Sequence, residues 1–376
     1  MTASAAAPTT TSKASTSEPE PRYSDAFMNR MRQTGDPLAD QVAAQLQRHL
    51  PSQMLDEVML RADREGGIFQ DFLDYSWTVP DWVDWHLIDR AARVQLAFGQ
   101  TRGVVLLVGG LAEGAGLNKA SEVLAATGRF KPEKVIKRLY ETGQMTHNSQ
   151  APNGLRPGGP GHRTIMEVRL LHAMVRRHLL SKGWDSAQFD HPINQEDMLF
   201  TIIEFNHLAV RGMARLGATL SREDREATHH FWRYVAYLNG VTDEFLTTSP
   251  EDEARAYDRI MEREHEIKPI TVERVHELIT GTAGKPPMYL PAGMLFELCA
   301  TCLGEERARQ YQLPRSRIWQ AVIKMLTVNN RLQTRLHYLV PGLGRVFGAY
   351  NFRLTHKMLT ANIEAEVEKR AFRCIA

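Results

Sequence analysis

His172 is the side chain best suited to bind a metal or to take part in a reaction. It lies in a segment whose apolar residues recur at the three- and four-residue spacing of a helix. Residues three and four positions apart share one face of a helix, so its imidazole would share a face with apolar side chains. A neutral imidazole is the commonest protein ligand for a metal or a haem iron. The same pattern also suits a buried, hydrogen-bonded core histidine. The apolar neighbours at this spacing are Val168, Leu171, Val175 and Leu179.

A second polar face precedes this histidine. Arg138, Glu141 and Thr142 stand at positions i, i+3 and i+4, so their polar groups project from one side of a helix. The plainer interpretation is a solvated face with an ordinary ion pair. Further upstream, Glu122 is followed directly by an apolar run, where partial desolvation would raise the pKa of the carboxyl group and suit acid–base chemistry. Its plainer alternative is a surface pair with Lys119 on the same helix.

Two arginines border the histidine face. Arg169 lies three residues before His172 and Arg176 lies four residues after it, so both guanidinium groups are close enough to flank the imidazole. Cations in these positions suit a haem, because they would neutralise the propionates while the imidazole meets the iron. A core histidine between two surface arginines gives the same pattern.

Composition excludes several other classes. Hydrophobic residues make up 43% and charged residues 24%, and the net charge of +2 comes without a dense Lys/Arg block, so we expect no nucleic-acid partner. Cys299 and Cys302 form a C-x-x-C pair, but Leu303 follows instead of histidine, so covalent c-type haem attachment is not indicated. The pair is interpreted as two small residues on a buried helix face, with a redox or disulfide role as the alternative. Phosphate-binding loop, dinucleotide-binding and esterase motifs are absent.

The elements expected between these residues are helices. Apolar residues recur at three- and four-residue spacing, alternating strand patterns are missing, and we predict one all-α domain over residues 23–376 after a disordered tail over residues 1–22. No apolar run is long enough for a membrane span, and the tail has no export signal. Helix starts are expected at Asp36-Pro37 and at Asn194, and a buried helix over 103–111. Further helices are predicted over 221–239, 249–266, 271–280, 293–303, 313–339 and 347–373.

An ordered set of short motifs resembles one known family. The motifs extend over roughly residues 30 to 245, and together they are similar to the latex clearing proteins, secreted rubber oxygenases related to the MpaB-type oxygenases. The C-terminal third matches only in helical character. The motifs are Gly35-Asp36-Pro37-Leu38-Ala39-Asp40, Pro80-Asp81-Trp82-Val83-Asp84, Thr127-Gly128-Arg129, Arg138-Leu139-x-Glu141-Thr142, Arg169-Leu170-Leu171-His172-Ala173-x-Val175-Arg176 and Pro192-Ile193-Asn194-Gln195-Glu196-Asp197.

The resemblance implies a globin-like helical fold that holds one non-covalent haem b. It implies oxidative cleavage of the carbon–carbon double bonds of poly(cis-1,4-isoprene) by dioxygen, which leaves aldehyde and ketone ends. By the same resemblance His172 would be the proximal iron ligand, Arg138 and Thr142 would line the distal pocket, and Glu122 would be the distal base. Within the family, a smaller isoprenoid or lipid-like alkene is the alternative substrate. A non-enzymatic helical protein that binds haem or a hydrophobic ligand is the third hypothesis.

The chain departs from the family pattern at Glu141. Well-known members carry a lysine there, and that lysine can ligate iron in a closed resting form. An ionised carboxylate is an acceptor only, so we expect a resting iron that is five-coordinate or water-ligated, with Glu141 paired to Arg138. The resemblance suggests an extracellular protein, although the chain has no signal peptide. A monomer is expected.

Overall fold

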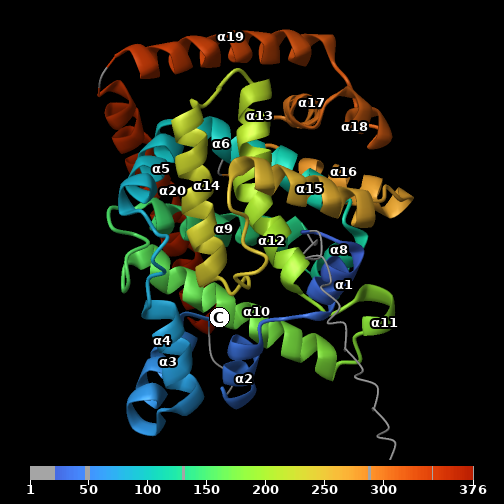
Figure 1. Cartoon of the computed structure of the whole chain (residues 1–376). Helices are drawn as coiled ribbons and strands as arrows, with labels where there is room; N and C mark the ends of the chain where they lie inside the picture. The colour runs from blue at the N-terminus through green and yellow to red at the C-terminus, as the bar shows by residue number, and fades with distance from the viewer. Residues whose placement is uncertain (1–21, 47–50, 129–131, 287–288, 341, 376) are drawn as a thin grey trace, which may run out of the picture.

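The protein is built from helices (Figure 1). The computed structural model describes residues 22–46, 51–128, 132–286, 289–340 and 342–375. No strand occurs within these ranges, where the one extended pairing is an isolated bridge between Leu117 and His265. The predicted all-α fold is confirmed. Residues 1–21 of the predicted tail lie outside the described residues, while Arg22 pairs with Asp252 at 3.3 Å.

Three of the N-terminal helices, α2 to α4, form a small cluster against one long helix, α10 (Pro160–Ser181). Asp36 caps α2, where its side chain accepts a hydrogen bond from the Ala39 N–H and Pro37 occupies the first turn, as predicted. The apolar faces of α2, α3 and α4 pack together and against α10, and this group lies at the bottom of Figure 1. The bounds are α1 (Asp25–Gln33), α2 (Pro37–Gln45), α3 (Pro51–Glu65) and α4 (Gly67–Trp77).

The main core lies between α5 (Trp85–Ala97), α12 (Gln195–Ile203) and α14 (Arg222–Leu238). Its largest members are aromatic: the ring of Trp232 is stacked on Phe205 with centroids 4.7 Å apart. Asn194 caps α12, and Asp197 returns the bond in a capping box, which confirms the predicted start of this helix.

Two helices of the core widen into π-helical turns and pack against each other there. The predicted buried helix over 103–111 is helical and largely buried, but it passes from α6 (Gly99–Val105) through the turn η1 (Leu106–Gly110) into α7 (Leu111–Gly114). Likewise α12 continues through η2 (Glu204–Leu208) into α13 (Ala209–Arg215). Such turns often occur at functional sites.

A second core surrounds α17, against which η1, α13, α16, α18 and α19 pack. Cys299 and Cys302 are free thiols buried in it, as interpreted from the sequence, and burial raises the pKa of Cys302 to about 12. The predicted helix over 313–339 begins later, at Arg317. The bounds are α8 (Asn118–Ala126), α9 (Pro132–Gln150), α11 (Ser186–Phe189), α15 (Pro250–Glu264), α16 (Pro269–Thr282), α17 (Ala292–Leu303), α18 (Glu305–Gln310), α19 (Arg317–Leu339) and α20 (Leu343–Ile375).

A helix that spans a membrane must be both long and strongly apolar. None of the described helices is long and apolar enough by itself, but Trp85–Ala97 and Gly99–Gly114 meet the criterion together as a pair bent by 82°. The first of these helices packs against α14 and α20 inside the protein.

Candidate functional site

A cavity of about 360 Å³ opens among α8, α9, α10, α12, η2 and α16. Its walls are mostly aliphatic and aromatic, with a few polar groups. Both its size and this composition are typical of sites for small molecules and cofactors, whose volumes run from about 300 to 1,000 Å³. The polar side chains on the walls belong to Ser121, Thr127, Arg138, Glu141, Thr142, His172, Asp197, Thr201, Glu204, Asn239 and Arg274.

His172 lies on the cavity wall that α10 provides. Val168, Leu171 and Val175 line the same cavity, which confirms three of the four apolar neighbours predicted for this imidazole, while Leu179 is buried outside the lining. The side chain is therefore next to a ligand-sized space and not enclosed by packed side chains on every side, which favours the ligand interpretation over the core-histidine alternative.

The structure does not bring Arg169 and Arg176 to this cavity. Both side chains are buried on the adjacent edge of α10 that meets α2: Arg169 forms two bonds to Asp36, at 2.6 and 3.0 Å, and Arg176 bonds to Asp40 at 2.7 Å. The sequence placed these guanidinium groups beside the imidazole, but the carboxylates of Asp36 and Asp40 turn them toward α2 and away from the cavity. They fasten α2 to α10 and stand outside the cavity lining.

Arg138, Glu141 and Thr142 share one wall of the cavity, as their spacing on α9 predicted. Glu141 is half-exposed, and its carboxylate lies 4.0 Å from the ammonium group of Lys137 one turn earlier. Arg138 thus contributes a cation and Thr142 a hydroxyl donor to a wall that is otherwise apolar.

Glu122 is close to the cavity without lining it. Its carboxylate accepts a hydrogen bond from Arg274 Nη2 at 2.8 Å, and Arg274 is itself on the cavity wall. Lys119, the alternative partner considered from the sequence, binds Asp190 at 2.9 Å and Glu264 at 3.4 Å instead. The surface pair with Lys119 was therefore the wrong expectation.

A buried carboxyl group that lines the cavity and was not predicted from the sequence belongs to Glu204. It is the first residue of η2, and burial raises its pKa to about 8, with the Glu113 carboxylate adding to the rise and Arg138 opposing it. Because Gly114 has no side chain, it leaves room for Glu204: a β-carbon on Gly114 would lie 2.4 Å from Glu204 Oε1. A signal was present in the sequence: Glu204 is the sole acid in the apolar run 198–205.

Behind η2 lies a set of buried polar contacts. Glu113 bonds to Arg211 and to the hydroxyl of Tyr257, and Arg211 also donates to that hydroxyl at 3.0 Å. Asn206 donates to Glu253 at 2.6 Å, and burial raises the pKa of Glu253 to about 8. Glu204 and Glu253 are thus largely neutral at pH 7. Glu204 lines the cavity, and Glu253 does not.

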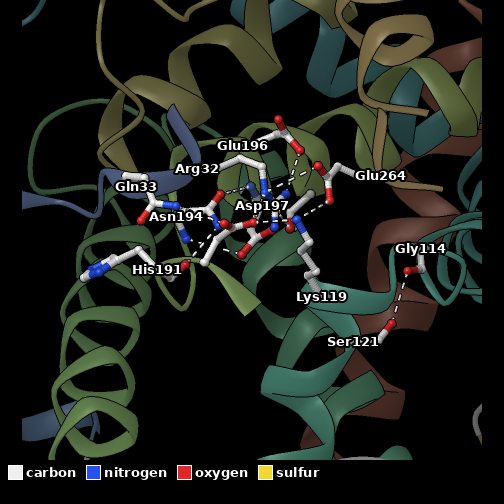
Figure 2. A network of polar contacts seen from close by, with 12 residues as sticks. Arg32, Gln33, Gly114, Lys119, Ser121, His191, Asn194, Glu196, Asp197 and Glu264 are labelled. Carbon is white, nitrogen blue, oxygen red and sulfur yellow. Dashed lines mark hydrogen bonds and ion pairs between the residues drawn. The ribbon is translucent and has the colours of Figure 1, made fainter. Parts of the chain in front are cut away.

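A separate ionic network holds the start of α12, where Asp197 reaches the cavity (Figure 2). Arg32 bonds to Glu196 at 2.7 Å and to Asp190 at 2.6 Å, and Lys119 joins the same group. Burial raises the pKa of Asp197 to about 6 against the opposing charge of Arg32. Figure 2 also shows Ser121, whose hydroxyl donates to the Gly114 carbonyl at 3.4 Å and so helps to fix the backbone beneath Glu204.

The polar side chains on the cavity wall suit a metal that is already coordinated by a cofactor and needs one ligand from the protein. Within the described ranges no three His, Cys, Asp or Glu side chains gather as a metal-binding cluster. A single imidazole on an apolar wall is what a porphyrin iron requires from a protein. Arg138 and Arg274 are the guanidinium groups that line the cavity, and either offers a cation to a propionate.

Comparison with known proteins decides the family. A model of the ER-bound oxygenase mpaB/B'/rubber oxygenase catalytic domain matches residues 96–329. The chain belongs to this family. The resemblance to latex clearing and MpaB-type proteins is thereby confirmed, although the matched domain begins later and extends further than the motifs did. Every residue that lines the cavity falls inside the matched oxygenase domain.

The chain is similar to one rubber oxygenase in sequence and to one solved structure in fold. The rubber oxygenase of Streptomyces sp. (strain K30) is 27% identical over 189 residues, which are 48% of this chain and 44% of that protein. The chain thus matches less than half the length of this relative. The structure of latex clearing protein LCP in the closed state has a TM-score of 0.54 and 18% identity, covering 86% of this chain and 90% of that one. This likeness shows a shared fold.

Proposed function

We propose that this oxygenase holds haem b on His172 and cleaves the carbon–carbon double bonds of poly(cis-1,4-isoprene) with dioxygen, giving oligo-isoprenoids with aldehyde and ketone ends. The observation that carries the proposal is the position of His172 on the wall of an apolar cavity within the oxygenase domain. When bound, haem b supplies the iron at which dioxygen is activated. The named relative, a rubber oxygenase, supports the substrate class.

The apolar walls of the cavity would form the binding site for this substrate. A polyisoprene chain offers no hydrogen-bonding group, so binding depends on burying its surface against Val168, Leu171 and Phe200 and on excluding water. Thr142 and Arg138 provide the hydrogen-bond donors on the α9 wall, where the resemblance implies that dioxygen is received. Arg274 pairs with Glu122 and keeps that carboxylate beside the cavity.

Proton handling is assigned to Glu204 in this proposal. Its carboxyl group faces the cavity and is largely protonated at pH 7, so its O–H donates a hydrogen bond and its conjugate base accepts a proton. Glu122, the base implied by the resemblance, is paired with Arg274 and lies outside the lining. Glu122 is then a positioning residue, which holds Arg274 against the cavity wall.

The cavity measures about 360 Å³ and would hold the haem as well as the substrate, so the limited remaining space makes a shorter isoprenoid alkene the second candidate substrate. Oxygen uptake by the haem-loaded protein should be compared on polyisoprene latex and on a short cis-isoprenoid, with products analysed by mass spectrometry. Carbonyl-ended oligomers from latex support polymer cleavage. Turnover of the short alkene alone assigns the smaller substrate, and no uptake on either contradicts the oxygenase proposal.

The haem ligand has its own test. His172→Ala is expected to lose stoichiometric haem, because the one imidazole on this wall is removed, whereas His178→Ala on the exposed side of the same helix keeps it. Haem content and the Soret band are measured after gel filtration. Full haem content and an unchanged spectrum in the His172→Ala protein would show that the ligand is elsewhere.

A further inference from the structure

Helix α19 (Arg317–Leu339) carries an apolar stripe that no other part of the described structure covers. The helix crosses the outside of the protein at the top of Figure 1, and Ile323 and Thr334 on its inner face are buried. On the outer face, apolar side chains recur at intervals of seven, three, four, four and three residues, and Ile318 and Leu339 at its two ends are each about 75% exposed. The stripe consists of Ile318, Met325, Val328, Leu332, Leu336 and Leu339.

A stripe of this length is unusual on a protein surface. Single exposed apolar residues are common, but a continuous row along 23 residues, about 34 Å of helix, is typical of an interaction surface. Exposed apolar groups continue past the end of α19, at Val340 and then at Val346, Phe347 and Tyr350 in the first turns of α20. The apolar surface therefore extends beyond one helix.

Positive charge follows the same segment. Arg317, Lys324, Arg331 and Arg335 are all exposed, and their spacing of seven, seven and four places them in a row along one edge of the stripe. From residue 307 to residue 363 the sequence has ten Lys and Arg and no Asp or Glu. The rest of the chain has 36 Lys and Arg against 44 Asp and Glu. Arg309 and Arg315, just before α19, are paired with Glu306, Glu297 and Glu305. The small net charge of the protein therefore hides a row of four exposed cations on α19 itself.

We propose that α19 lies in the interface of an anionic lipid surface, with its apolar stripe among the acyl chains and its basic row against the headgroups. An apolar face bordered by Lys and Arg is the pattern of helices that lie in the plane of a membrane interface. A helix that lies across the outside of the protein presents a ridge, which can sink into lipid and gives a globular partner no groove to fill.

Charge argues against a second copy as the occupant. A two-fold dimer through this face would place the same surface on both sides, so two basic rows would meet with no acid among residues 307–363 to offset them. Anionic headgroups supply the missing negative charge. The inference rests on this surface alone and is independent of the reaction proposed for the cavity.

Vesicle flotation with the full chain tests the proposal. The protein is mixed with vesicles of phosphatidylcholine alone, or with about 30% phosphatidylserine added. We expect flotation with the anionic vesicles, at least tenfold weaker binding to the neutral ones, and release as NaCl rises from about 0.15 M to about 0.5 M, because salt shortens the range of the attraction. Equal binding to both vesicles, or binding to neither, would overturn the proposal.

Matched variants separate the two parts of the surface. Lys324→Gln with Arg331→Gln should weaken binding to the anionic vesicles about 25-fold, at about fivefold for each cation removed. Met325→Gln with Leu332→Gln should abolish flotation. Arg64→Gln with Lys182→Gln, an exposed basic pair on α3 and at the end of α10, is the control and should bind like the wild type.

Self-association is measured on the same proteins by sedimentation velocity. A wild-type dimer that Met325→Gln with Leu332→Gln converts to a monomer would make the stripe a subunit interface and would overturn the lipid proposal. Monomers throughout, together with loss of flotation in this variant, support it. Because all the substituted side chains are exposed, near-ultraviolet circular dichroism should show an unchanged fold.

Discussion

The carboxylate of Glu204 lies so close to Gly114 that a β-carbon on this glycine would come within 2.4 Å of Oε1. Glu204 is the first residue of η2, and Gly114 is the last residue of α7, which follows η1. Ser121 of α8 donates a hydrogen bond to the Gly114 carbonyl. A glycine here allows a buried acid to reach the cavity. The orientation of Glu204 therefore depends on what residue 114 is.

Gly114→Ala should consequently reduce turnover by displacing Glu204. General acid–base groups contribute on the order of 10²- to 10⁴-fold to rate, so we expect a fall of at least tenfold in oxygen uptake. The stability cost of overpacking, about 1–3 kcal/mol, is partly offset by the helix propensity of alanine. Gly348→Ala is the control, because its β-carbon would make an ordinary 3.5 Å contact with Leu96. Wild-type uptake by Gly114→Ala would refute this relationship.

The raised pKa of Glu204 makes a second prediction, about stability and pH. Its pKa is about 8 in the folded protein against 4.5 in the unfolded chain, so between these values the folded state holds the extra proton and wild-type stability falls as pH rises. Glu204→Gln has no proton to lose. Relative to the wild type, this variant should gain stability between about pH 5 and pH 8, on the order of a few kcal/mol. Urea unfolding at several pH values measures the difference.

Glu253→Gln is the matched control for this acid. Its pKa is also raised to about 8, but it bonds to Asn206 and does not line the cavity. In both variants the free energy of unfolding should fall less steeply as pH rises. Only Glu204→Gln should lose turnover. If Glu253→Gln lost turnover as fully as Glu204→Gln, the loss would belong to the packing around η2 and not to a proton at the cavity.

Glu204 and Glu253 also show the limit of what could be predicted from the sequence. The caps at Asp36 and Asn194 were predictable, because a cap depends on residues adjacent in the chain. The apolar face around His172 was predictable for a similar reason, since helical spacing fixes it. The π-helical turns that bring Glu204 to the cavity were not, because they form where two helices remote in sequence pack together.

The arginines of α10 illustrate the same limit. Spacing placed Arg169 and Arg176 beside His172, and it correctly put them on a neighbouring edge of the helix. Which edge meets the cavity was decided by Asp36 and Asp40, more than 130 residues earlier, whose carboxylates hold both guanidinium groups against α2. The spacing of residues along one helix does not reveal an ion-pair partner that is remote in the sequence.

The buried pair of Arg169 and Asp36 provides a third prediction. Both side chains are 3% exposed, so Arg169→Ala would leave a buried carboxylate unpaired at a cost of about 3–5 kcal/mol. Haem content per folded protein should stay at the wild-type level, because Arg169 does not line the cavity. Chemical denaturation and the absorbance of the folded fraction measure the two effects. Haem loss without loss of stability would restore Arg169 as a propionate partner.

The last prediction concerns Glu141, which stands on the cavity wall at the position where the resemblance implies a lysine. Its carboxylate is half-exposed and lies 4.0 Å from Lys137, so we expect no nitrogenous sixth ligand in the ferric haem protein. Glu141→Lys should supply one, since a deprotonated amine binds iron where an ionised carboxylate offers only oxygen. The optical spectrum of the ferric protein should then change to a low-spin form, more fully as pH rises and the amine loses its proton.

Lys137→Glu is a suitable companion to Glu141→Lys. It reverses the charge on the neighbouring residue of α9, which stands outside the cavity lining, and should leave the wild-type spectrum unchanged. A nitrogenous sixth ligand already present in the wild-type ferric spectrum would contradict the expectation for Glu141. An unchanged high-spin spectrum in Glu141→Lys at high pH would show that residue 141 does not reach the iron from this wall.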